Sequence, residues 1–195
     1  MTRLAAFPCD GGTNQELHPI PAFSFLAPAT RMLLSADGST TALLQALRSG
    51  PLTVRVLGQS VTQARYVPEN ARHALLLGED AQVLDRRSAL VDEELRTVSV
   101  NHVVTLHAPQ SQLGGIASGT SAIGPQLSKH RVEHHRELIA CGVGLWPEAP
   151  EPLAAAVKAY VIYSGGAPLI FIRETFNPAI VPPATDGLTE ISSYG

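Results

Sequence analysis

The sequence lacks the features that would place it in several broad classes of protein. It has no excess of basic residues, because 14 Lys and Arg stand against 17 Asp and Glu, which argues against nucleic acid or an anionic membrane surface as a partner. No run of apolar residues approaches the length of about 18 that a transmembrane helix needs. The apolar stretch from Leu4 to Phe7 is too short for the core of a secretory signal. We therefore expect a cytoplasmic protein.

Cysteines and cofactor motifs are scarce as well. The two cysteines, Cys9 and Cys141, have no metal-binding spacing, and a reduced protein is a simpler explanation than a single disulfide. The sequence contains no G-x-S-x-G, no P-loop and no G-x-G-x-x-G. His130 and His134 have the i, i+4 spacing of a zinc site, but they have charged neighbours and no third ligand at a suitable spacing. We expect neither a metal nor a cofactor.

The composition is typical of one folded domain. Apolar residues make up 45% of the 195 residues and charged residues 16%, so the chain can bury a sizeable core. Prolines and glycines punctuate residues 1–28, and further prolines follow Asn177. We expect a single domain with an N-terminal arm over 1–28, a core over 29–178 and a C-terminal tail over 179–195.

Local patterns predict helices mixed with antiparallel strands. Helical spacing predicts helices over Ala29 to Leu34, over Thr40 to Arg48 with Ser39 as N-cap, and over Ile123 to Cys141. Alternation predicts strands over Leu52 to Leu57, Val83 to Val91, Leu95 to Val104, Ala154 to Tyr163 and Leu169 to Phe176. Residues 66–81 are expected to be mostly loop, whereas 92–94 and 164–167 are expected to be hairpin turns. The pattern indicates an α+β fold in which helices pack on an antiparallel sheet.

The last predicted strand carries a carboxylate on an apolar face. Period two places Glu174 beside Ile170, Ile172 and Phe176. A carboxylate in such surroundings is costly unless it has a partner, and otherwise its pKa rises. A raised pKa suits a general acid near neutral pH. The alternative is a structural Glu that reaches water or pairs with an arginine.

Two neighbouring arginines face opposite sides of another predicted strand. Arg86 shares its face with Leu84, and Arg87 faces the other way. An arginine on an apolar face requires a planar anion, which is either a ligand carboxylate or a protein carboxylate such as Glu174. A register error of one residue would exchange Arg86 with Arg87. On the next strand, His102 is either a hydrogen-bonded core histidine or a catalytic group.

Four segments in order resemble the chorismate pyruvate-lyase family, whose members yield 4-hydroxybenzoate. They are LLSADGSTTALLQALRSGPLTVRVL from Leu33, VLDRRSAL from Val83, SAIGPQLSKHRVEHHRELIACG from Ser121 and GGAPLIFIRETFNP from Gly165. Together they cover roughly residues 29–178. The resemblance implies a six-stranded antiparallel sheet with helices on one side and a ligand enclosed between sheet and helical flaps. The sixth strand would lie near Ser60 to Tyr66.

The resemblance also implies a site. The ligand-binding arginine of the family matches Arg86, and its active-site glutamate matches Glu174. Backbone amides that contact the ligand fall near Thr40 and at Ile123, which precedes Gly124. The second arginine of the family aligns with Asn101, which is a departure because chorismate carries two carboxylates. We place Asn101 and His102 among the expected substrate-binding residues, and Arg87, Arg96 or Arg173 could supply the missing charge.

The function implied is a cofactor-free elimination of pyruvate from chorismate that gives a hydroxybenzoate. Asn101 and His102 favour one alternative, an enzyme of the same fold with another reaction, such as a cyclase, dehydratase or isomerase of specialised metabolism. Another alternative is a non-catalytic small-molecule-binding module, because the same scaffold serves as an effector domain in transcription regulators. In each case the expected partner is a carboxylated ring compound, and the protein is expected to be a monomer or a small homo-oligomer.

Overall fold

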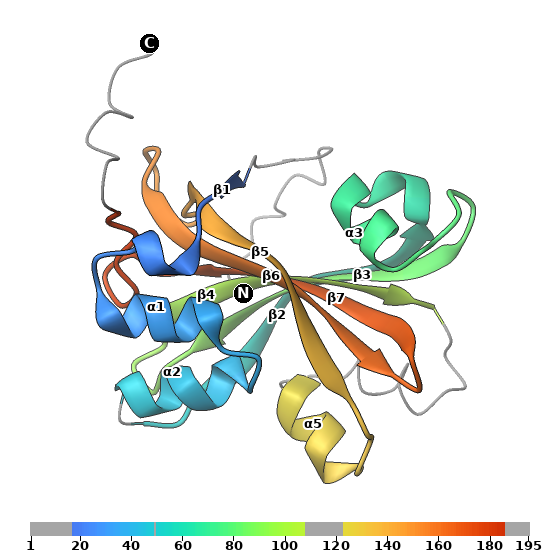
Figure 1. Ribbon diagram of the computed structural model, residues 1–195, viewed down its shortest axis with the longest axis horizontal. Coiled ribbons are helices and arrows are strands. Elements are labelled where there is room, and N and C mark those ends of the chain that lie inside the picture. Colours follow the sequence, from blue (N-terminus) through green and yellow to red (C-terminus); the bar gives the residue numbers. More distant parts are fainter. Residues whose placement is uncertain (1–16, 49, 108–122, 186–195) are drawn as a thin grey trace, which may run out of the picture.

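The computed structural model describes residues 17–48, 50–107 and 123–185 (Figure 1). Within these ranges the chain forms one antiparallel sheet of seven strands in the order β1-β5-β6-β7-β4-β3-β2. The strands are β1 (His18–Pro19), β2 (Thr53–Gln63), β3 (Gln82–Val91), β4 (Thr97–Leu106), β5 (His135–Leu145), β6 (Ala154–Ser164) and β7 (Ala167–Phe176). The helices are α1 (Pro28–Ser35), α2 (Thr40–Arg48), α3 (Glu69–Ala74) and α5 (Ile123–Lys129), with 3-10 turns at Ala22–Ser24 and Ala64–Tyr66. The predicted α+β class is confirmed.

The first two helices and both hairpin turns lie where the sequence predicts them. The backbone N–H of Ala42 donates to the Ser39 hydroxyl at 3.4 Å, which caps α2. In the β6–β7 turn, Gly165 and Gly166 have φ angles of +58° and +78°, a left-handed pair that favours glycine and matches the twist of a tight hairpin. Asp92 begins the β3–β4 turn, and its carboxylate accepts backbone N–H bonds from Glu94 and Arg96. These features are local, which is why the sequence predicts them correctly.

The long helix predicted over Ile123 to Cys141 is wrong. Only Ile123–Lys129 is helical, Arg131 has a left-handed φ of +53°, and β5 follows from His135. This strand pairs along its length with β6 and also with β1. At Gly142 an added Cβ would lie 2.0 Å from the His18 carbonyl oxygen, so the β1 contact requires glycine there. Pairing with distant strands overrides the helical spacing of this segment.

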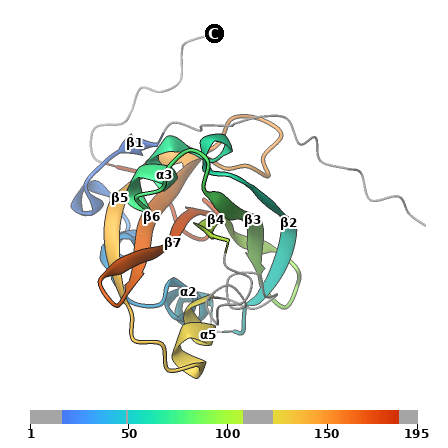
Figure 2. The same ribbon diagram turned by 90° about the vertical axis from the view of Figure 1, so that its right-hand side faces the viewer.

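Two further details of the sheet differ from expectation. The sheet has seven strands instead of six, because β5 replaces a predicted helix and the two-residue β1 adds an edge. No separate strand forms at Ser60 to Tyr66, since β2 runs unbroken to Gln63 and a 3-10 turn follows. The predicted loop over 66–81 contains α3, and the described helices are not all on one side of the sheet (Figure 2).

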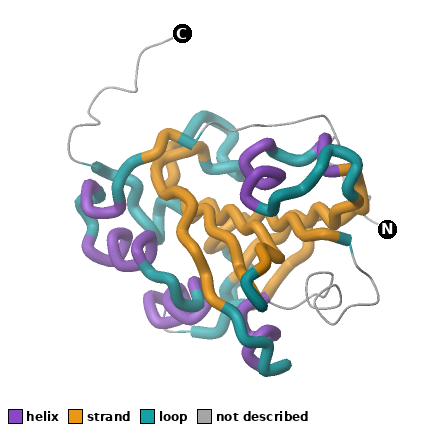
Figure 3. Tube along the Cα trace, turned by 45° about the vertical axis from the view of Figure 1, so that its right-hand side comes forward, coloured by secondary structure: helices purple, strands orange, loops and turns teal. Residues whose placement is uncertain are grey.

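The two faces of the sheet carry separate apolar cores. On one face, α1 and α2 bury Leu33, Leu34 and Leu44 against residues such as Val98 and Phe176. Leu127 of α5 extends this face with a second cluster that includes Ile162, Ile170 and Ile172. On the other face, α3 packs Ala71 and Leu75 against Val83, Val104, Val161 and Phe171. Figures 1 and 3 show α1, α2 and α5 set apart from α3 around the twisted sheet.

The first residues of the described tail pack on α1. The Thr30 hydroxyl donates to the Pro182 carbonyl at 3.0 Å, and the Leu26 N–H donates to the Ala184 carbonyl at 2.9 Å. Val181 is buried in the same core as α1. The two ends of the described chain therefore contact each other on the face of the sheet that α1 covers. In the ranges described, no helix has the length and apolar content to cross a membrane.

Candidate functional site

A cavity lies between the sheet and helices α2 and α5. Its apolar lining comes from Val54, Leu90, Val103, Ile123, Tyr160 and Ile172, and its uncharged polar lining from Ser39, Thr40, Thr41, Ser88 and Asn101. Gly124 lies at the α5 end. Three charged residues also line it, namely Arg86, Arg136 and Glu174. The cavity thus combines an apolar floor with a carboxyl group and two guanidinium groups.

Glu174 lies on β7 at the centre of the sheet, on the face that strand parity predicts. It is 4% exposed, and its Oε2 atom is buried with no hydrogen-bond partner in the described part of the chain. Burial raises the pKa of Glu174, and the Thr40 hydroxyl, the Lys158 ammonium, the Arg136 guanidinium and the Tyr160 hydroxyl each oppose that rise. A buried carboxyl with a raised pKa can hold or accept a proton near neutral pH.

Arg86 of β3 reaches the same cavity from two strands away. Its side chain is 2% exposed, whereas Arg87 is exposed, so the strand register predicted from parity is correct. Burial lowers the pKa of Arg86 below its usual value, yet an arginine remains cationic in proteins. A buried guanidinium on an apolar floor is suited to a planar carboxylate.

The remaining predicted site residues divide into two groups. Thr40 and Ile123 are the first residues of α2 and α5, and both line the cavity together with Gly124. Asn101 also lines it, as the direct cross-strand neighbour of both Glu174 and Ser88. Its side-chain oxygen accepts a hydrogen bond from the Ser99 hydroxyl at 3.1 Å.

His102 does not line the cavity. Adjacent residues of a strand face opposite sides, so Asn101 and His102 cannot both point to it. On the far face, His102 Nε2 is hydrogen bonded to Asp85 Oδ1 at 2.7 Å. The sequence places His102 among the expected substrate-binding residues, whereas the structure gives it a carboxylate partner outside the cavity.

Arg136 is a cavity residue that the sequence reasoning missed. It falls within the helix predicted over Ile123 to Cys141, but it lies on β5, opposite Ile162 of β6. Its Nη1 donates to the Asp37 carbonyl oxygen at 3.5 Å. Residues 136–142 do not alternate, because two charged residues are followed by four apolar ones, so period two gave no signal for a strand here. None of the three arginines considered as a second cation (Arg87, Arg96, Arg173) lines the cavity.

Lys158 lies beside the site on β6, directly opposite Glu174 in the strand register. It is 2% exposed, and its ammonium donates to the carbonyl oxygens of Leu33, at 3.1 Å, and Ala36, at the end of α1. Burial lowers the pKa of Lys158, and the negative charge of Glu174 opposes that effect. The lysine therefore holds the end of α1 through hydrogen bonds and stabilises the negative charge of Glu174.

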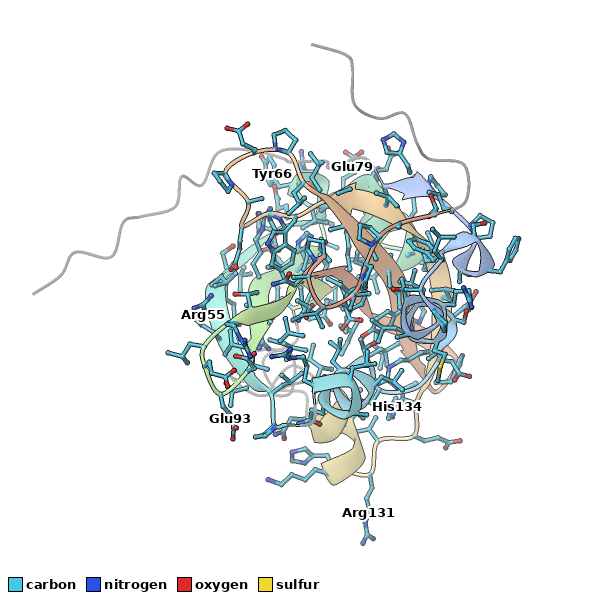
Figure 4. The ribbon with its side chains drawn as sticks, turned by 90° about the vertical axis from the view of Figure 1, so that its left-hand side faces the viewer. Arg55, Tyr66, Glu79, Glu93, Arg131 and His134 are labelled. Atoms are coloured by element: carbon cyan, nitrogen blue, oxygen red, sulfur yellow. The ribbon has the colours of Figure 1, made fainter. Side chains whose placement is uncertain are left out.

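The histidine pair considered for zinc does not form a helical site. Because α5 ends at Lys129, His130 and His134 are not on one helical face, and His134 Nδ1 is hydrogen bonded to the Val132 carbonyl at 2.7 Å. Figure 4 shows Arg131 extending away from the body of the protein at this end. Among the residues with described positions, no group of three His, Cys, Asp or Glu side chains could hold a metal ion.

Comparison with solved structures gives the class of fold. The effector domain of PhnF from Mycobacterium smegmatis superposes with a TM-score of 0.55 at 12% identity, covering 73% of this chain and 90% of that domain. A GntR-family transcriptional regulator from Enterococcus faecalis gives 0.52 at 14% identity, covering 66% of this chain and 95% of that one. The chain thus has the α+β fold of these regulatory domains.

Sequence comparison gives the family. Residues 34–182 match the family described as chorismate pyruvate-lyase Rv2949c-like. The chain belongs to this family, which confirms the resemblance drawn from its four segments. No curated protein matches the chain.

Proposed function

We propose that this protein is a chorismate pyruvate-lyase that converts chorismate to 4-hydroxybenzoate and pyruvate without a cofactor. The observation that carries the proposal is the convergence of Arg86, Glu174, Thr40 and Ile123 on one apolar cavity, within a chain of this family. Strand parity selects Arg86 and Glu174 independently of the family. The family selects the same two residues.

The reaction requires the protein to bind chorismate and to transfer one proton. The ring loses a proton from the carbon that bears its hydroxyl group, the neighbouring carbon–oxygen bond breaks, and the enolpyruvyl group leaves with the bonding electrons. The departing enolate takes up a proton and becomes pyruvate, and the remaining ring becomes aromatic. Aromatisation drives the reaction, so the site must orient the ring and exclude water.

Each residue then has a defined task. The buried guanidinium of Arg86 binds the ring carboxylate, together with the backbone N–H groups at Thr40 and Ile123. Glu174, whose pKa is raised by burial, accepts the ring proton at the opposite end. Val103 and Ile172 lie side by side on the sheet and form the floor under the ring. An apolar, dry surrounding strengthens both polar contacts relative to water.

Ligand entry requires the cover of the cavity to move. The free volume is about 40 Å³, which is room for about three water molecules and far less than a ring compound needs. The sheet floor is fixed by strand pairing on both sides, whereas α2 and α5 form the cover. We therefore place the opening movement in α2 or α5.

The test is turnover of chorismate by the purified protein, with pyruvate and 4-hydroxybenzoate measured separately. We expect equal amounts of the two products, a large loss in Glu174→Gln and Arg86→Gln, and little change in Arg87→Gln. Arg87 is the matched control because it lies next to Arg86 and is exposed. Absence of both products with folded protein, or an equal loss in the Arg86 and Arg87 variants, would refute the proposal.

Asn101 supports a second candidate, which is binding or turnover of a different carboxylated ring compound. The family pattern has an arginine at this position, and the superposed regulatory domains show that the fold is compatible with a role other than catalysis. Calorimetry with 4-hydroxybenzoate separates the two candidates: tight binding without any turnover of chorismate favours the second.

A further inference from the structure

Arg136 gives the cavity a second cation on the side opposite Arg86. In the sheet order, β3 lies two strands from β7 on one side and β5 lies two strands from it on the other. Strands are about 4.8 Å apart, so the backbones at Arg86 and Arg136 are separated by roughly 19 Å along the sheet. Both side chains nevertheless line the same cavity, with Ile172 between them on β7.

The Arg136 guanidinium interacts with the charge of Glu174 and with the Tyr160 hydroxyl, but it forms no ion pair with a described carboxylate. A Cβ added at Gly124 would lie 2.9 Å from its Nη2, so the glycine allows the guanidinium to lie against the start of α5. Its Nη1 has one long hydrogen bond to a backbone oxygen, and its buried Nε has no hydrogen-bond partner in the described ranges. The ion pairs found among those residues do not include Arg136.

Lys158 cannot take this role. It is the other cation near Glu174, but its ammonium is bound to the carbonyl oxygens at the end of α1 and does not line the cavity. Asn101, at the position where the family pattern has its second arginine, brings no charge. The cavity therefore has two guanidinium groups for ligand anions, one on β3 and one on β5.

We infer that Arg136 binds the second carboxylate of a ring compound that carries two, and that it makes the site select dicarboxylates over monocarboxylates. A guanidinium can bind a carboxylate through two parallel hydrogen bonds, which fixes the orientation of the ring between Arg86 and Arg136. The inference deepens the proposed function, because it rests on the same cavity binding a carboxylated ring. It assigns a task to Arg136, which is not among the site residues that the family resemblance implies.

The test compares two stable ligands that differ in one carboxylate. Vanillate has a ring carboxylate and a methyl ether, and 3-(carboxymethoxy)-4-hydroxybenzoate has the same ring with a second carboxylate on that ether. Dissociation constants are measured by calorimetry for the wild type, Arg136→Gln and Arg86→Gln. Arg131→Gln is the matched control, since Arg131 is an exposed arginine close to Arg136 in sequence and outside the cavity.

We expect the wild type to bind the dicarboxylate at least tenfold more tightly than vanillate. Arg136→Gln should lose about tenfold or more for the dicarboxylate and less than threefold for vanillate, whereas Arg86→Gln should weaken both. Arg136→Lys, which keeps the charge but not the paired geometry, should fall between wild type and Arg136→Gln. This variant keeps the test decisive if Arg136→Gln folds poorly.

Four results would overturn the inference: equal losses for both ligands in Arg136→Gln, no loss for either ligand in that variant, a wild type that binds neither ligand, or a wild type that shows no preference between them. Its failure is distinguishable from failure of the lyase proposal. Selection for the dicarboxylate without turnover of chorismate would refute only the lyase. Turnover that is unchanged in Arg136→Gln, together with unchanged dicarboxylate binding, would refute only the role of Arg136.

Discussion

Replacing Lys158 with methionine should destabilise the protein through two separate interactions. The variant keeps the apolar stem but removes the hydrogen bonds to the Leu33 and Ala36 carbonyls, each of which is worth about 1.5–3 kcal/mol for a charged donor. It also removes the charge opposite Glu174. Part of this loss is recovered because the variant no longer buries an ammonium group, which by itself costs several kcal/mol. We expect a net loss of about 3 kcal/mol at pH 7.

The assay is urea unfolding of four proteins: wild type, Lys158→Met, Glu174→Gln and the double variant. Direct neighbours across a sheet should show an interaction energy of about 1–2 kcal/mol. Below the raised pKa of Glu174 the carboxyl is protonated and uncharged, so the interaction energy should decrease as the pH is lowered through that pKa. Lys129→Met is the control, because this lysine is exposed, and it should change stability by less than about 0.5 kcal/mol.

The raised pKa of Glu174 also determines how the free energy of unfolding changes with pH. A raised pKa means that the folded state holds this proton more tightly than the unfolded state. The stability that the protonated group contributes is complete below the unfolded pKa of about 4.3 and is lost as the pH rises through the raised folded pKa. Glu174→Gln should lack this decline. A loss in Lys158→Met no larger than in Lys129→Met, or an interaction energy that does not decrease as the pH is lowered, would refute the reasoning.

Other substitutions test single features of the fold and the site. Leu44→Ala, at a fully buried position of α2, should cost about 3 kcal/mol in urea unfolding, whereas Leu47→Ala, at a half-exposed position of the same helix, should cost far less. Burial by itself would raise the pKa of Asp92, but hydrogen bonds from Arg96 and Arg48 hold that pKa below its usual value. The resulting stability is present above about pH 4 and is lost as the pH falls through the lowered pKa, so Asp92→Asn should flatten the acid side of the melting-temperature profile. Gly124→Ala should displace the Arg136 guanidinium and weaken dicarboxylate binding in calorimetry, whereas Gly78→Ala, where an added Cβ meets nothing within 4 Å, should not.

Contradictory results are equally specific for these substitutions. Equal losses in the two leucine variants would mean that α2 does not pack as described. An unchanged acid profile in Asp92→Asn would remove that carboxylate from the acid sensitivity of the fold. Full dicarboxylate affinity in Gly124→Ala would show that the Arg136 guanidinium can shift without losing the ligand. Its charge would then matter for binding, but its contact with Gly124 would not.

The sequence by itself determined the local parts of this protein. Alternation along a strand is a property of each residue and its near neighbours, so it placed Arg86 and Glu174 on the face that carries the cavity and Arg87 on the surface. The α2 cap at Ser39 and the Gly165–Gly166 turn are also decided within a few residues. The family resemblance added Thr40, Ile123, Gly124 and Asn101, all of which line the cavity.

Only the tertiary structure decided the secondary structure of residues 130–145 and the identity of the second cation in the cavity. Helical spacing in this segment competes with hydrogen bonds to β6, which follows nine residues later, and to β1, which lies more than a hundred residues earlier. A sequence window contains neither partner, so it cannot weigh them, and Arg136 was placed on a helix. For the same reason, the sequence did not show that His102 pairs with Asp85 outside the cavity, or that Lys158 binds the end of α1 beside Glu174. Their surroundings come from strands and helices brought together only by folding.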